Sequence, residues 1–240
     1  MEALLDSEVS DNQGNRWTFV AICPDSSFVQ TVHHGKRTLE SAIEFIGKIK
    51  SSSDGDAPLF SSDDWFYEKA LLAHYGEEFR PPYAGRGRYP LSYLVPKDTL
   101  RYVQVIKKRN DKGKIMEIGE KIVYGKKEEI EAHYIQAKRS KHINTDYVES
   151  RNGKFRLCCA RLIRKTLCFS KKAIFHDAMI SFTAQIFNYC QPVAALKRCI
   201  NPVAARFKQK YEQVSAAMAE KLIDKILTIK DLLCIRPRIV

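Results

Sequence analysis

The chain has 240 residues, of which 45% are hydrophobic, and a formal net charge of +12. This length and apolar content suit one large domain, or one domain with an appendage. No run approaches the roughly 18 apolar residues of a membrane span. The opening residues, MEALLD, lack the basic and apolar regions of a signal peptide. We therefore expect a cytoplasmic protein with no membrane partner.

The charge is unevenly distributed along the chain. Residues 1–64 hold 11 acidic and 5 basic residues, a net charge of −6, which leaves +18 on the remainder. This surplus predicts nucleic acid or another anionic surface as the partner, although many cytosolic proteins are simply basic. The seven cysteines form no CxxC pair, which argues against a disulfide framework and a structural zinc site. We expect them to be reduced and mostly buried.

Hydrophobic periodicity and turn residues predict a strand hairpin, a helix, a short strand and a second helix in the first third of the chain. Pro24–Ser27 is the turn of the hairpin. Ser62-Asp63-Asp64 ends the short strand, and Gly76 ends the second helix. The expected elements are strands 17–23 and 28–32, a helix over 39–49, a strand over 57–61 and a helix over 67–75.

The rest of the chain predicts a β insertion at about 80–125 followed by helices. Arg80–Pro90 holds three prolines, two glycines and three arginines, so it is expected to be a loop. Asn110–Gly113 is the predicted turn between two strands. The expected elements are strands 102–108 and 115–124, helices over 128–136 and 174–189, and a helical tail from about 204 to 233.

A strongly basic segment follows Glu149. Ser150–Lys172 contains eight lysines and arginines and no acidic residue. A lone carboxylate beside so many cations could be a metal ligand held against a phosphate backbone. The alternative is a solvated basic helix with an incidental Glu near its N-terminus, where the helix dipole favours a carboxylate.

The same segment resembles a known family. The run Tyr147–Asn152 (YVESRN), then Arg156 and the run 164–172 (RKTLCFSKK), is similar to the third catalytic block of DDE transposases, above all those of the insertion-sequence-one group. In that block a Tyr/His-Val/Ile-Glu-Arg-x-Asn motif carries the catalytic Glu. Here Ser150 stands where the family has Arg, and Arg151 follows it. The resemblance implies Glu149 as the catalytic glutamate.

Two further carboxylates are implied by the resemblance. Phe60–Tyr67 (FSSDDWFY) is similar to the family's Thr-Asp-Gly-Trp-x-x-Tyr block, which implies Asp63 as the second ligand. The alternative role for Asp63 is to cap the following helix, and Asp64 is an adjacent substitute. The family's first block is degraded in this sequence, and Leu4–Val9 is its best remnant. Asp6 is the candidate for the first catalytic carboxylate, and Asp11 is a less favoured one. Similar segments run from about residue 14 to 234.

The fold implied by the resemblance is α/β and RNase H-like (retroviral-integrase-like), with a mixed sheet flanked by helices. It would occupy residues 1–190, N-terminally truncated, with a helical C-terminal tail over 191–240. The implied activity is DNA cleavage and strand transfer by Mg²⁺ or Mn²⁺ held by Asp6, Asp63 and Glu149. We expect Asp63 and Glu149 to face each other across one cleft.

DNA, both transposon ends and target, is the implied partner, in a homo-oligomer when active and in association with the nucleoid. The family's N-terminal zinc finger and helix-turn-helix are not in this sequence, so the alternative is a catalytically inactive, truncated or domesticated DNA-binding remnant. An RNase H-like nuclease acting on RNA or hybrids is a third possibility. The residues expected to bind DNA are Arg151, Asn152, Lys154, Arg156, Arg161, Arg164, Lys165, Lys171 and Lys172.

Overall fold

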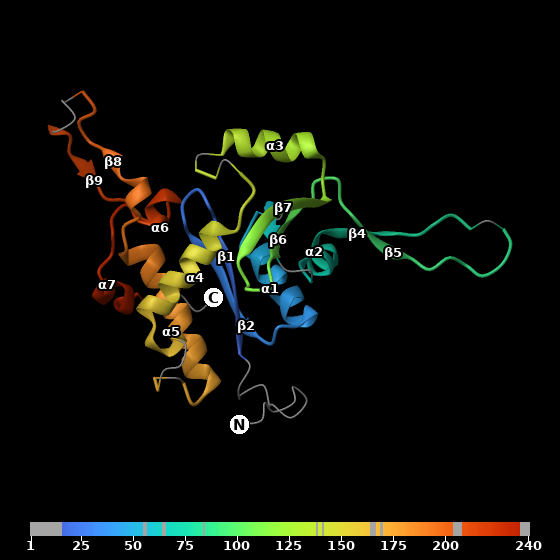
Figure 1. Ribbon diagram of the computed structural model, residues 1–240, viewed down its shortest axis with the longest axis horizontal. Coiled ribbons are helices and arrows are strands. Elements are labelled where there is room, and N and C mark those ends of the chain that lie inside the picture. The colour runs from blue at the N-terminus through green and yellow to red at the C-terminus, as the bar shows by residue number, and fades with distance from the viewer. Residues whose placement is uncertain are drawn as a thin grey trace. The chain divides into compact units, whose positions relative to one another are not determined.

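The computed structural model describes residues 16–54, 57–63, 66–83, 85–137, 139–140, 142–163, 167–168, 170–203 and 208–235. They form a mixed α/β structure that contains a mixed sheet flanked by helices (Figure 1). Among these residues no helix combines the length and the apolar character that a transmembrane segment requires.

The chain divides into two compact units. The first, which we call the sheet unit, consists of Arg16–Phe19 and His33–Asp146. The second, which we call the helical unit, contains Val20–Val32 and the described residues of Tyr147–Val240. The two units divide the chain at places other than the predicted boundary at residue 190, which stays a prediction.

The described part of the chain begins with the predicted hairpin. Strands β1 (Trp17–Ile22) and β2 (Val29–Gly35) form a two-stranded sheet. The backbone N–H of Cys23 donates to the Phe28 carbonyl at 2.9 Å and closes the turn. The ends of this hairpin belong to the sheet unit and its tip to the helical unit.

A three-stranded mixed sheet forms the centre of the sheet unit. Strand β3 (Leu59–Ser62) pairs in parallel with β6 (Arg101–Arg109), and β6 pairs antiparallel with β7 (Ile115–Tyr124). Helices α1 (Leu39–Ser51) and α2 (Tyr67–Tyr75) pack against each other. The predicted strands and helices in this part of the chain are therefore confirmed. Because β6 pairs with β3, residues 101–109 and 115–124 are part of this sheet, and the β insertion at about 80–125 stays a prediction.

Helices cover both faces of this sheet. Tyr102 and Val103 are both buried although neighbouring side chains of a strand point to opposite faces. On one face the ring of Phe60 lies 5.8 Å from that of Tyr75 in α2. On the other face Tyr134 of the predicted helix α3 (Lys127–Gln136) bonds to the Ser61 side chain, and burial raises the pKa of the Tyr134 hydroxyl.

Two short strands that the sequence analysis did not expect flank the predicted proline-rich loop. Strands β4 (Gly76–Phe79) and β5 (Tyr93–Pro96) pair antiparallel and carry the loop between them away from α2 (Figure 1). Gly76 ends α2 as predicted and also begins β4. The position requires glycine, because a Cβ there would collide with the Leu72 carbonyl.

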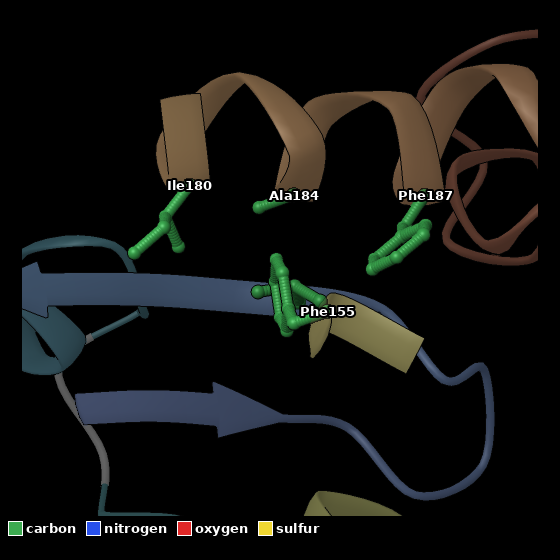
Figure 2. Packing of buried hydrophobic residues seen from close by; sticks show 5 residues of the cluster. Phe155, Ile180, Ala184 and Phe187 are labelled. Carbon is green, nitrogen blue, oxygen red and sulfur yellow. The ribbon is translucent and has the colours of Figure 1, made fainter. Parts of the chain in front are cut away.

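The helical unit is built around α4 (Asp146–Cys158) and α5 (Ala173–Gln185), which continues into the π-helical turn η3 (Ile186–Cys190). Figure 2 shows its core, where Phe155 of α4 meets Ile180, Ala184 and Phe187. The rings of Phe155 and Phe187 lie 4.9 Å apart, close to edge-on. Val29 of the hairpin completes this cluster.

The prediction of a helical tail over 204–233 is wrong. The described residues instead form a small hairpin and two short helices: β8 (Arg198–Cys199), β9 (Tyr211–Glu212), α6 (Ala216–Ala219) and α7 (Ile229–Cys234). The Asn201 side chain bonds to the backbone of Lys208 and Lys210 across the hairpin, and such local bonds compete with a helix. Residues 204–207 and 236–240 lie outside the described part.

The expectation that the cysteines are mostly buried is also wrong. All seven lie among the described residues, and Cys159 is buried, whereas Cys158, Cys168 and Cys234 are exposed. Cys190 is half-buried, and burial together with the nearby Asp231 raises the pKa of its thiol.

Candidate catalytic site at the end of strand β3

Asp63 lies where a ligand-binding carboxylate is expected in an α/β sheet, directly beyond the carboxyl end of β3. Its side chain is 54% exposed, and Oδ2 lies 3.7 Å from Nζ of Lys107, a side chain that is only 9% exposed. The alternative that Asp63 caps α2 is not supported, because the N-cap of that helix is Phe66 and no side chain caps it.

Lys107 also holds the segment that precedes α4. Its Nζ donates to Oγ1 of the buried Thr145 at 2.7 Å. One residue earlier, the Asn144 carbonyl accepts from the Ser61 hydroxyl at 3.3 Å. The Asn144 side chain in turn accepts from the Asp146 backbone N–H, the first residue of α4. The chain entering α4 is therefore fixed beside the end of β3.

A pair of hydroxyls fixes the end of β3 on its opposite face. Ser62 Oγ and the Tyr102 hydroxyl lie 2.7 Å apart, and Tyr102 is fully buried. Since Ser62 precedes Asp63, this bond limits the movement of the strand end that carries the carboxylate.

An open depression of about 320 Å³ lies beside Asp63. Its lining brings one carboxylate together with two cations, so it can accept either a hydrated cation at the carboxylate or an anion at the cations. The lining residues are Asp63, Gln104, Val105, Ile106, Lys107 and Arg109.

Of the other predicted carboxylates, Glu149 is the one that lies among the described residues. Glu149 is exposed in the first turn of α4 and belongs to the helical unit, so its distance from Asp63 stays a prediction. Asp6, Asp11 and Asp64 lie outside the described residues. Within either unit by itself, the described residues bring no three carboxylate, histidine or cysteine ligands together.

Arg151 is not available to DNA as the structure describes it. It is only 6% exposed, and it donates to the backbone carbonyl of Ser27 at 2.8 Å. Its guanidinium lies 5.0 Å from the centre of the Phe187 ring. Ser27 has a positive φ of 60°, a conformation that costs free energy outside glycine. Arg151 therefore stabilises the turn between β1 and β2, and we remove it from the predicted DNA-binding set.

The remaining residues of the predicted DNA-binding set differ in exposure. Lys154 and Arg156 are exposed on α4, and Lys171 and Lys172 are exposed just before α5. Arg161 is half-buried and donates to the Ser170 hydroxyl at 2.7 Å. Asn152 is half-buried, and Arg164 and Lys165 lie outside the described residues.

The sequence analysis missed the role of Asn188 in η3. Its side chain is 1% exposed and makes two bonds to one residue of β2: Oδ1 accepts from the Val29 N–H at 2.8 Å, and Nδ2 donates to the Val29 carbonyl at 2.9 Å. The amide thus replaces a neighbouring strand at that position of β2. The only signal in the sequence is an Asn within an otherwise apolar and aromatic stretch.

No family model, no curated protein and no solved structure matches this chain.

Proposed function

We propose that this chain is the catalytic domain of an insertion-sequence transposase of the DDE type, which cleaves DNA and transfers strands with Mg²⁺ or Mn²⁺. One observation carries the proposal: the strand end that bears Asp63 also holds the segment leading into α4, through Ser61 to Asn144 and Lys107 to Thr145. Glu149 follows Thr145 by four residues in the chain.

The order of elements supports an RNase H-like fold for this domain. A hairpin, a helix, the short strand β3, a second helix and the parallel partner β6 occur in this order, with the β4–β5 hairpin between the second helix and β6. A further strand before Trp17, carrying Asp6, would complete the arrangement implied by the family resemblance.

The proposed metal ligands are Asp6, Asp63 and Glu149. When bound, a pair of divalent ions stabilises the attacking and leaving oxygens of an in-line phosphoryl transfer. The half-exposed Asp63 suits this role because carboxylate oxygens are the ligands that Mg²⁺ and Mn²⁺ prefer. Lys154 and Arg156 would bind DNA phosphates.

Lys107 also favours a second candidate, an inactive DNA-binding remnant of such an enzyme. Its nearly buried ammonium already lies 3.7 Å from Asp63, so the carboxylate has a cation beside it without any metal. In a remnant this ion pair would be the permanent state, and the basic segment would still bind DNA.

A nicking assay on supercoiled DNA with Mg²⁺ or Mn²⁺ separates the two candidates. We expect weak nicking by the native chain and a loss of at least about 100-fold in Asp63→Asn and Glu149→Gln, because each removes a charged metal ligand. Glu131→Gln is the matched control, since Glu131 is an exposed glutamate on α3.

DNA binding must be measured on the same variants to interpret the nicking assay. Binding retained in all variants, with nicking lost in two, supports the transposase. Binding by the native chain without any nicking supports the remnant instead. Nicking that survives in Glu149→Gln contradicts the assigned site, and a native chain that does not bind DNA contradicts both candidates.

A further inference from the structure

The β4–β5 arm, which we define as residues 76–96, has a composition unlike the rest of the sheet unit. Between Phe79 and Pro96 it contains three arginines and three tyrosines but no aspartate or glutamate. Figure 1 shows the arm extending away from α2. The exposed side chains of this stretch include Arg80, Arg86, Arg88, Tyr83, Tyr89 and Tyr93.

The base of the arm is a defined structure. Gly76–Phe79 pairs residue by residue with Tyr93–Pro96, and the rings of Phe79 and Tyr93 meet at 5.5 Å in a T-shaped contact. Both strands also pack on α2. The outer loop is therefore presented by a paired and anchored base.

Two tyrosines stack face to face in the outer loop. The rings of Tyr83 and Tyr89 lie 4.3 Å apart at an interplanar angle of 19°, and the Tyr83 hydroxyl donates to the Gly87 carbonyl at 3.1 Å. Tyr89 is 73% exposed, so the face of its ring that does not meet Tyr83 is open to solvent. A planar group can extend this stack at little cost, because the two rings are already parallel.

Arginines lie beside the stacked pair. Gly85 and Gly87 have φ of +75° and +88°, the left-handed conformation that favours glycine, and they flank Arg86 in the outer loop. Arg86 and the following Arg88 are both exposed. No acidic residue lies between Phe79 and Pro96, and the two glutamates of the arm, Glu77 and Glu78, lie in its base strand β4.

We propose that the β4–β5 arm binds nucleic acid with unpaired bases, such that Arg86 and Arg88 contact phosphates and a base stacks on Tyr89. Positive charge next to an exposed aromatic platform is the combination that binds single strands without sequence preference. Charge argues against a second copy of the outer loop as the occupant, since the stretch from Phe79 to Pro96 carries three arginines and no acidic residue and two such loops would repel each other. The proposal concerns a site separate from Asp63 and goes beyond the proposed strand transfer.

Fluorescence anisotropy tests the arm in the full chain, with a labelled oligothymidine of about 20 nucleotides, long enough for one such site, and with its duplex. We expect the double variant R86Q/R88Q to bind the single strand at least tenfold more weakly. The slope of log affinity against log salt should fall by about 1.4, because each phosphate that an arginine neutralises contributes roughly 0.7. K112Q/K114Q is the matched control, because it removes two exposed lysines from the β6–β7 turn.

The stacking part of the proposal has its own pair of variants. Tyr89→Leu keeps an apolar side chain but removes the ring, and it should weaken single-strand binding about tenfold while changing duplex binding less than twofold. Tyr89→Phe keeps the ring and should bind as the native chain does. Equal losses in both variants would show that the hydroxyl, not the stack, makes the contact.

Native affinity for the single strand in R86Q/R88Q and in Tyr89→Leu would overturn the proposal. Sedimentation of the same variants gives a second check. If they no longer self-associate but bind the oligonucleotide as the native chain does, the proposal is overturned and the arm is assigned to a contact between copies. Asp63→Asn and Glu149→Gln should keep full single-strand binding, so failure of the transposase proposal can be told apart from failure of this one.

Discussion

Polar side chains serve different purposes in the two units. In the helical unit Arg151 and Asn188 are buried, and each satisfies backbone groups of the hairpin. In the sheet unit Asp63 is half exposed, and its partner Lys107 borders an open depression. A buried polar group that is fully bonded stabilises the fold, whereas a polar group that faces solvent beside a cation remains available for binding. Exposure therefore separates the structural residues of a basic sequence from those that can bind DNA or metal.

Removing Arg151 is expected to have the largest effect on stability. Arg151→Ala should lower the free energy of unfolding by about 2–4 kcal/mol, because it removes a charged hydrogen bond and leaves the Ser27 carbonyl without that donor. Arg156→Ala, on the exposed side of the same helix, should change it by less than about 0.5 kcal/mol. Urea unfolding measures both, and equal values would contradict the assignment of Arg151 to the core.

The Asn188 amide is expected to contribute nearly as much. Asn188→Ala should cost about 2–3 kcal/mol, because it leaves the buried N–H and carbonyl of Val29 without the amide. Asn201→Ala is the control, since that side chain also makes two backbone bonds but in an exposed hairpin. Thermal unfolding of the two variants should differ clearly, and a smaller loss for Asn188 would contradict the role given to it.

Lys107 is expected to act mainly on metal affinity. Lys107→Met should raise the affinity for Mn²⁺ about fivefold or more, since two unit charges 4 Å apart interact by about 1 kcal/mol even in water. Lys108→Met, which removes an exposed lysine paired with Glu117, is the control. Calorimetric titration measures the change, and a weaker Mn²⁺ affinity in Lys107→Met would show that the lysine assists the metal instead of competing with it.

The exposed cations of α4 should affect DNA binding and leave the fold unchanged. Lys154→Gln combined with Arg156→Gln should lower the salt slope for duplex DNA by about 1.8, from roughly 0.9 for each phosphate contact. The pair Lys221→Gln and Lys225→Gln, exposed in the same unit, should lower it much less. If the two pairs of substitutions lower the salt slope equally, α4 contributes only general positive charge.

Local sequence signals predicted most of the elements, for reasons that the structure makes clear. The amphipathic pattern of α1, the turn residues of the β6–β7 hairpin and the helix end at Gly76 depend on nearby residues, and all three are confirmed. The prediction of a helical tail was wrong because side-chain bonds to the backbone, such as those of Asn201, stabilise a hairpin there. The strands of the β4–β5 arm were missed because four residues each give too little pattern to recognise.

The candidate site was predictable only in part. The position of Asp63 after a short apolar strand can be read from the sequence, whereas its pairing with Lys107, 44 positions later, depends on the parallel register of β3 and β6. Arg151 was misassigned for a related reason: a list of cations does not indicate which one turns toward the core, and its contact with Ser27 joins residues 124 positions apart.

The central proposal is that Asp63 and Glu149 both serve as metal ligands, and Mn²⁺ binding tests it most directly. The electron paramagnetic resonance signal of free Mn²⁺ should fall when the native chain is added, and it should fall equally with Glu131→Gln. We predict that Asp63→Asn and Glu149→Gln each abolish most of this Mn²⁺ binding. The double variant should retain as much Mn²⁺ binding as the single variant that binds Mn²⁺ more weakly. Native Mn²⁺ binding in either single variant would contradict the claim.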